Sequence, residues 1–238
     1  MKVTILIPTL NEEGGIGPTL DSVDLDAFRA RGWAWEFLVV DGASRDRTKA
    51  EAEARGARVI VEPRRGYGRA YKTGFAKAAG DVIVTGDADG TYPFDRAHEY
   101  VDHLVRRDLD FITCDRYARL HEGAMSVKHR LGNWVLSATA RALFRVRVRD
   151  SQSGMWIVRR SALDRIPFDS LPDGMAFSQE IKIEAFKRRD VAATEIPSEL
   201  RPRIGHAVIE SWRDGFGNLR ALLRKRLRGR VGSVKPGP

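Results

Sequence analysis

Short apolar runs alternate with helical stretches through the first half of the chain, and this alternation restricts the possible folds more than any other feature. Each run holds four or five residues, many of them Val or Ile, as buried strands do. Strands that alternate with helices form a mostly parallel sheet flanked by helices, so we predict an α/β fold. The predicted strands are Val3–Ile7, Phe37–Val40, Arg58–Val61, Val82–Thr85 and Phe111–Cys114.

Helices are predicted between these strands, and through the less regular second half, from the spacing of apolar residues. In the second half, Met155–Val158 is a further predicted strand, and Ala193–Glu199 is expected to be extended. Trp134 and Trp156 are expected in the core. The predicted helices are Ile16–Val23, Asp46–Arg55, Gly68–Ala79, Pro93–Arg106, Leu131–Phe144, Phe177–Arg188 and Ser211–Arg228.

Two aspartates, Asp87 and Asp89, directly follow the predicted strand Val82–Thr85 and have glycine on both sides. Ligands of α/β folds bind at the carboxyl edge of the sheet, where such a strand ends. Two hard oxygen donors suit Mg²⁺ or Mn²⁺, which proteins hold with one or two carboxylates plus substrate phosphates. An Asp-x-Asp motif alone is also common in polar turns that precede a helix, so other parts of the chain must decide.

Two further predicted strands also end in acidic or amide side chains, namely Asn11 and Glu12 after the first and Asp41 after the second. All three strand ends should lie along one edge of the sheet. This is the layout of a nucleotide site, with one carboxylate for the nucleoside and a pair for a metal on the diphosphate. The glycine-bearing stretch Arg65–Ala70 is a weak phosphate-loop signal, and the Gly-x-Gly-x-x-Gly pattern of NAD sites is missing after the first strand.

The composition sets the remaining limits. The 238 residues suit one large domain with an appendage, and a hydrophobic content of 42% is enough for a core. Cys114 is the only cysteine, so no intrachain disulfide and no cysteine-based metal site can form. No run of about 18 uncharged apolar residues occurs, so we expect no transmembrane helix.

The positive charge is concentrated near the C-terminus. Residues 212–238 contain eight Lys or Arg and one Asp, a net charge of +7 out of +9 for the whole chain. This distribution argues against a nucleic-acid-binding domain and favours a local contact with a polyanionic surface. An apolar stripe with basic flanks suits a helix that lies on anionic lipid, although a terminal helix packed on its own domain is the alternative. The stripe consists of Trp212, Phe216, Leu219, Leu222, Leu223 and Leu227.

Six motifs, in this order, resemble those of known glycosyltransferases. Three in the first half resemble the inverting family-2 glycosyltransferases of GT-A fold, and three in the second half resemble the polyprenyl-phosphate (dolichyl-phosphate) mannose and glucose synthases. The resemblance covers about residues 1–225. The motifs are Ile7–Glu13, Val39–Thr48, Gly86–Gly90, Asp150–Met155, Gln179–Lys182 and Leu200–Gly205.

The resemblance implies a role for each candidate residue. Asp89 and Arg116 would act at the reacting groups, and the metal would be Mg²⁺ or Mn²⁺. This chain departs from the family pattern in two places. Asp41-Gly42-Ala43 differs in the part that would recognise the base, and His206-Ala207 stands where the family often has a phosphate-binding lysine. The implied nucleoside ligands are Pro8, Asn11, Glu12 and Asp41; the metal ligands are Asp87 and Asp89; and the phosphate ligands are Arg116, Arg130 and Arg203.

The acceptor decides which further residues are needed. A lipid monophosphate is already mostly ionised at neutral pH and needs positioning by arginine or lysine. Arg201 and Lys128 could assist in that positioning. A hydroxyl acceptor would need a general base, and Glu180 and Asp150 are the candidates for it.

The expected function is metal-dependent, inverting transfer of a hexose from a nucleotide sugar to polyprenyl or dolichyl phosphate. GDP-mannose is the first choice of donor, and UDP-glucose or UDP-N-acetylglucosamine the next. Transfer to a hydroxyl and nucleic-acid binding through the tail are the alternatives. We expect a GT-A domain at 1–205, an amphipathic helix at 206–228 and a disordered tail at 229–238, in a cytoplasmic protein that is peripheral on the cytoplasmic face of an anionic membrane.

Overall fold

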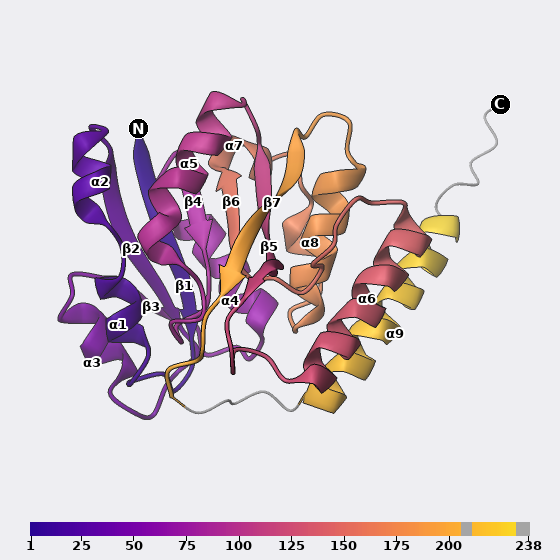
Figure 1. The fold of residues 1–238 in the computed structure, drawn as a ribbon, viewed down its shortest axis with the longest axis horizontal. Coiled ribbons are helices and arrows are strands. Elements are labelled where there is room, and N and C mark those ends of the chain that lie inside the picture. Colours follow the sequence, from indigo (N-terminus) through magenta and orange to yellow (C-terminus); the bar gives the residue numbers. More distant parts are fainter. Residues whose placement is uncertain (206–210, 232–238) are drawn as a thin grey trace.

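The structure is a computed structural model that describes residues 1–205 and 211–231, with the side chains of the last helix described from 215 to 227. A seven-stranded sheet in the order β3-β2-β1-β4-β6-β5-β7 forms the centre (Figure 1). Only β6 among these strands is antiparallel to its neighbours, so the predicted α/β fold with a mostly parallel sheet is confirmed. The strands are β1 Lys2–Thr9, β2 Ala34–Asp41, β3 Arg58–Val61, β4 Val82–Thr85, β5 Phe111–Leu120, β6 Trp156–Arg159 and β7 Ala193–Leu200.

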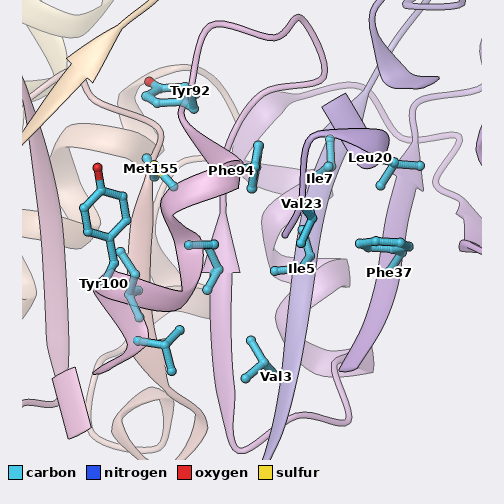
Figure 2. Close-up of a cluster of buried hydrophobic side chains, with 14 of the residues drawn as sticks. Val3, Ile5, Ile7, Leu20, Val23, Phe37, Tyr92, Phe94, Tyr100 and Met155 are labelled. Carbon is cyan, nitrogen blue, oxygen red and sulfur yellow. The ribbon is translucent and has the colours of Figure 1, made fainter. Parts of the chain in front are cut away.

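One face of the sheet is covered by helices of the first half. Successive side chains of a strand point to opposite faces, so Val3, Ile5 and Ile7 of β1 share this face. Figure 2 shows these residues together with Leu20 and Tyr100 in one buried cluster. The covering helices are α1 Ile16–Asp21, α2 Leu25–Ala30, α3 Thr48–Glu53 and α5 Ala97–Arg106, the last preceded by the 3₁₀ turn η1 Phe94–Arg96.

The opposite face carries an aromatic cluster. The rings of Tyr71 and Phe177 stack with centroids 5.9 Å apart, and Trp156 packs against both, so its predicted place in the core is confirmed. This face is covered by α4 Tyr67–Lys77, α7 Arg160–Leu163 and α8 Ala176–Lys187, with the 3₁₀ turn η2 Phe168–Ser170 before α8.

Two long helices, α6 Val127–Phe144 and α9 Ser211–Val231, lie side by side at one end of the molecule (Figure 1). They enclose a third apolar cluster with α8, in which Leu222 of α9 is fully buried. The predicted place of Trp134 in the core is wrong, because its side chain on α6 is 60% exposed. Within the described residues, no helix is both long and apolar enough to cross a membrane.

The predicted end of the last helix is too early. Helix α9 continues to Val231, so 229–231 are helical and are not part of a disordered tail. The expected boundary at 205/206 and the tail from 232 onward lie outside the described residues, as does the side chain of Trp212. The described part of the predicted stripe divides between two sides: Leu222 is buried, whereas Phe216, Leu223 and Leu227 are exposed.

The sheet register brings the predicted strand ends together. Thr9 at the end of β1 pairs with Asp41 at the end of β2, and Leu6 of β1 pairs with Thr85 at the end of β4. The loops that follow these three parallel strands therefore leave the sheet at the same edge. That edge is where the candidate site lies.

Candidate active site

The aspartate pair lies at the end of β4, whose four residues are all buried. Asp89 is only 4% exposed. Its Oδ1 accepts hydrogen bonds from the backbone N–H and the hydroxyl of Thr91, at 3.1 and 2.6 Å. The Tyr67 hydroxyl lies 3.5 Å from Oδ1 of Asp87. Two hydrogen bonds from Thr91 thus hold the Asp89 carboxylate, whereas the contact of Asp87 with Tyr67 is long.

The charges around Asp87 are closely spaced. Burial raises its pKa to about 7, the negative charge of Asp89 adds to the rise, and the guanidinium groups of Arg116 and Arg203 oppose it. Burial also raises the pKa of Glu12, against the attraction of Arg203. Three carboxylates therefore share one edge of the sheet, and additional positive charge there would stabilise their ionised forms.

Arg203 joins two of these carboxylates. Its Nη1 donates to Oδ2 of Asp89 at 2.8 Å, and its Nη2 donates to Glu12. The backbone N–H of Ile204 also donates to the carbonyl of Asp89 at 2.8 Å. The Nε atom of Arg203 is buried and has no hydrogen-bond partner among the described residues. A ligand oxygen at this position would satisfy that donor.

Arg116 forms a bidentate pair with Asp150. Its Nε and Nη2 donate to the two carboxylate oxygens at 2.6 and 2.9 Å, and both residues are buried. Burial raises the pKa of Asp150, but Arg116 outweighs that effect and lowers it overall. Asp150 is therefore ionised at neutral pH, and both of its oxygens are engaged.

Gly154 of the 150–154 loop lies beside Asp87. Its N–H donates to the Tyr92 hydroxyl at 2.6 Å, and its carbonyl accepts from Thr85 Oγ1 at 2.8 Å. A Cβ at this position would lie 2.6 Å from the Tyr67 hydroxyl and 3.3 Å from Oδ1 of Asp87. Only glycine fits here without displacing the aspartate or the tyrosines.

The loops after β1 and β2 hold each other. The N–H of Asn11 donates to Ser44 Oγ at 2.8 Å, and its side-chain oxygen accepts from the N–H of Arg45 at 2.9 Å. Asp41, almost wholly buried, accepts from the N–H of Ser44 at 3.1 Å. Pro8 is half-buried in β1 beside them. The structure thus brings Asn11 and Asp41 to the same edge as Glu12, as the sequence predicts.

Two predicted residues lie elsewhere. Glu180 is buried in α8 and forms an ion pair with Lys225 of α9, at 3.0 Å, beside a cleft of about 740 Å³ between these helices and the 167–176 segment. This ion pair joins the two helices, and the expectation that Glu180 acts as a general base stays a prediction. Arg130 is exposed in the first turn of α6, whereas Arg116 and Arg203 reach the carboxylates.

Sequence reasoning missed Tyr67, Tyr92 and Gly154 as parts of the site. Tyr92 follows the aspartate motif by three residues, and Tyr67 lies in the glycine-bearing stretch. Their closeness to these motifs in the sequence is the signal that could have pointed to the two tyrosines. Those glycines serve packing: a Cβ on Gly66 or Gly68 would collide with the backbone carbonyls of the 172–173 segment.

The donor set fits a divalent cation that a substrate helps to hold. Within the described residues, no group of three or more His, Cys, Asp or Glu side chains could bind a metal ion alone. Asp87 and Asp89 supply hard oxygen donors, and burial together with the charge of Asp89 raises the pKa of Asp87 despite Arg116 and Arg203 nearby. Magnesium and manganese sites with one or two carboxylates are completed by substrate phosphates and water.

Comparison with known proteins defines the class. The family model "Glycosyl transferase family 2" matches residues 4–167. That is more than half of the chain, which therefore belongs to glycosyltransferase family 2. The resemblance seen in the sequence motifs is confirmed, and the chain is a glycosyltransferase by family membership.

Two relatives are similar to this chain over most of its length. The low-salt glycan biosynthesis hexosyltransferase Agl6 of Haloferax volcanii is 34% identical over 225 residues, which cover 93% of this chain and 53% of that protein. The chain thus spans about half the length of this relative. A dolichyl-phosphate hexose transferase of the same organism is 30% identical over 214 residues, covering 90% of this chain and 89% of the relative.

The fold also matches solved structures. Glucosyl-3-phosphoglycerate synthase from Mycobacterium tuberculosis, in complex with phosphoglyceric acid, matches with a TM-score of 0.75 at 22% identity, over 94% of this chain and 79% of its own. This likeness confirms the predicted GT-A fold of the domain.

Proposed function

We propose that this chain transfers a hexose, with inversion, from a nucleotide sugar to polyprenyl or dolichyl phosphate, using Mg²⁺ or Mn²⁺. The observation that carries the proposal is the cluster at one edge of the sheet, in which Glu12, Asp87 and Asp89 lie with Arg116 and Arg203. It combines carboxylates for a cation with guanidinium groups for phosphates. The similarity to a dolichyl-phosphate hexose transferase supports the lipid-phosphate acceptor.

The donor is assigned to the ends of β1 and β2 and the loops that follow them. Pro8, Asn11, Glu12 and Asp41 would hold the nucleoside, since they border the carboxylate pair from the side of β1. GDP-mannose is the first candidate donor, followed by UDP-glucose and UDP-N-acetylglucosamine. The synthase from Mycobacterium tuberculosis has been solved with Mn²⁺ and UDP, which supports a divalent ion on the diphosphate.

The residues of the chain would then position the phosphates. A divalent ion held by Asp87 and Asp89 supplies neutralisation of the leaving diphosphate. Arg203 offers its buried Nε to a phosphate oxygen, and Arg116 adds positive charge from its fixed place on Asp150. The acceptor phosphate is already ionised and needs only orientation.

The placement of the two candidate bases favours a phosphate acceptor over a hydroxyl. A hydroxyl acceptor needs a group that removes its proton. Glu180 is paired with Lys225, and both oxygens of Asp150 are bound by Arg116. Neither carboxylate offers a base beside Asp87, so the proposed mechanism assigns no catalytic role to Glu180.

The helices α6 and α9 are proposed to lie on an anionic membrane, on its cytoplasmic face. Together they contain ten Lys or Arg and one Asp, and in the rest of the chain 31 basic and 31 acidic residues cancel. The whole net charge of +9 is thus located in two adjacent helices. The same helices carry exposed apolar side chains, which favours lipid over nucleic acid as the partner: Val127, Leu131, Trp134 and Val135 on α6, and Phe216, Leu223 and Leu227 on α9.

Transfer of radiolabelled sugar into organic-extractable product tests this function. GDP-mannose, UDP-glucose and UDP-N-acetylglucosamine are supplied in parallel, each with polyprenyl phosphate or with a polyprenol that lacks the phosphate. We expect label in the lipid phase with one donor, only with the phosphorylated acceptor and only with a divalent ion. Equal labelling of the unphosphorylated polyprenol would favour the hydroxyl-acceptor alternative, and no labelling with any donor would contradict the proposal.

A further inference from the structure

Lys182 of α8 is a lysine with only 1% of its surface exposed, and it lies under the 150–154 loop. Its ammonium group donates to the carbonyls of Ser151 and Ser153 at 2.8 and 2.5 Å, with Ser178 Oγ at 3.3 Å. The ring of Trp156 lies 5.7 Å away. Burial of a charge costs free energy unless the group is well hydrogen-bonded, so the presence of a lysine at this position needs a physical reason.

The surroundings of Lys182 disfavour its charged form. Burial, with a smaller contribution from the nearby guanidinium of Arg116, lowers its pKa to about 7 against the attraction of Asp150. The bonds of its Nζ go to backbone carbonyls and a hydroxyl. A neutral donor could bond the same carbonyls at lower cost, so a gain in stability does not account for a lysine here.

The loop that Lys182 holds connects two parts of the site. At one end, Asp150 binds Arg116 with both oxygens. At the other end, Gly154 donates to Tyr92 and packs against Asp87. The three carbonyls that accept from Lys182 belong to Asp150, Ser151 and Ser153 of this same loop. A shift of the loop would therefore move Arg116 and the neighbours of Asp87 together.

We propose that Lys182 is a positioning residue for the transfer reaction, which clamps the 150–154 loop so that Arg116 and Tyr92 keep their places relative to Asp87. The kinetic part of this inference rests on the proposed function. A displacement of about 1 Å in such a group can lower a rate by about 100-fold. The effect of Lys182 should thus appear in turnover although it lies outside the site itself.

Lys72 supplies a matched control. It is also a buried lysine, and it donates to the carbonyl of Leu171 and to Asp173, in a different loop. Lys182→Met and Lys72→Met remove the same charge and leave the same unbranched side chain, one atom shorter than lysine. We expect Lys182→Met to lower kcat by about 10- to 100-fold with unchanged KM for the nucleotide sugar, and Lys72→Met to lose similar thermal stability without that drop. Equal losses of kcat in the two variants would overturn the proposal.

A double-mutant cycle tests whether Lys182 acts through Arg116. If it does, the double variant of Lys182→Met and Arg116→Lys should lose less than the product of the two single losses. Losses that multiply would contradict the positioning role. Lys182→Gln, which keeps a donor for the carbonyls, should recover part of the rate, and it carries the same tests if Lys182→Met does not fold.

Amide hydrogen exchange supplies a readout that needs no turnover. In Lys182→Met, exchange should accelerate in 150–154 and around Arg116 in β5, and stay unchanged in β4. Unchanged exchange around Arg116 would overturn the clamp even if the enzyme is active. If the wild-type protein transfers no hexose to lipid phosphate, the proposed function fails, while the exchange result still decides the role of Lys182.

Discussion

At the scale of single residues, the site is a balance of four carboxylates (Glu12, Asp87, Asp89 and Asp150) and two guanidinium groups (Arg116 and Arg203). Asp150 has its own arginine and is ionised, whereas burial and Asp89 hold the pKa of Asp87 well above its usual range. The difference follows from hydrogen bonding: Arg116 contacts Asp150 directly, while it acts on Asp87 only through space. Asp87 is therefore the carboxylate that gains most from a cation.

Replacement of Asp89 by Asn should abolish metal-dependent turnover while the fold is kept. Asn retains an oxygen for Thr91, but it cannot neutralise a cation, and loss of such an electrostatic group lowers kcat by about 10²–10³-fold. The measurement is sugar transfer across a series of Mn²⁺ concentrations, with the thermal midpoint as a control for folding. Excess chelator should stop the wild-type enzyme equally, and full activity under chelation would refute the metal assignment.

The pKa of Asp87 predicts how the metal-free protein responds to pH. Its pKa rises from 3.8 to about 7 on folding, so between these values the native state binds a proton that the unfolded chain has released. The free energy of unfolding should therefore fall as the pH rises through this range, and Asp87→Asn should reduce the slope. Denaturant unfolding at several pH values, without metal, measures both slopes. Identical slopes would show that Asp87 titrates normally.

Arg203 is expected to serve ligands as well as carboxylates. Arg203→Ala should weaken transfer by about 1.5–3 kcal/mol for each charged hydrogen bond lost, because the buried Nε is then missing from the ligand site. Steady-state kinetics with varied lipid phosphate, together with titration of free nucleotide, separates the two substrates. Equal weakening of both would assign Arg203 to the donor diphosphate, and unchanged kinetics would leave it only its bonds to Glu12 and Asp89.

At the scale of elements, α9 has two distinct sides. Leu222 is buried against α6 and α8, and Lys225 forms ion pairs with Glu180 and Glu184 of α8. Leu223 and Leu227 are exposed on the other side. The interpretation as a packed terminal helix therefore holds for the side that carries Leu222, and the membrane contact stays a proposal for the exposed side.

Substitutions on the two sides of α9 should have opposite effects. Leu222→Ala should cost about 2–5 kcal/mol of unfolding free energy, because it opens a cavity in a packed cluster. The double variant Leu223→Ser and Leu227→Ser should leave stability nearly unchanged and reduce sedimentation with anionic vesicles, since it removes apolar surface that would enter the lipid. If this double variant is destabilised as strongly as Leu222→Ala, the exposed side is not a membrane surface.

At the scale of the whole molecule, the net charge is separated from the sheet and its covering helices. The sheet and its covering helices are neutral in sum, and all of the net charge belongs to α6 and α9. Such a separation would orient the molecule on an anionic surface, because only one end is attracted to it. The end that carries α6 and α9 is visible in Figure 1.

Charge reversal at this end should release the protein from vesicles. Arg224→Glu with Arg226→Glu should reduce binding to anionic vesicles strongly, at about 1 kcal/mol per basic side chain near the surface. Arg106→Glu with Arg107→Glu, an equal charge change on exposed residues of the α5 end, should have a smaller effect. Binding is measured across salt concentrations, and wild-type release should increase with salt. Equal effects of the two pairs would indicate attraction by net charge alone.

The sequence by itself determined the features that depend on local pattern. Apolar runs and their spacing specified the strands and helices, and a polar motif at a strand end marked Asp87 and Asp89, because every parallel strand of a sheet ends at the same edge. The tertiary structure alone decided which side chains meet. Arg203 and Glu12 are 191 residues apart in the chain, and Arg116 and Asp150 are 34 apart, so no local pattern predicts either pair.

The same reason explains where Glu180 and Trp134 lie. Glu180 has the chemistry of a base, but its place against Lys225 follows from the packing of α8 on α9. Trp134 has the spacing of a core residue, but α6 is covered on only one side, so the packing decided its exposure. Periodicity gives a helix its apolar face, and only the neighbouring helices determine how much of that face is buried.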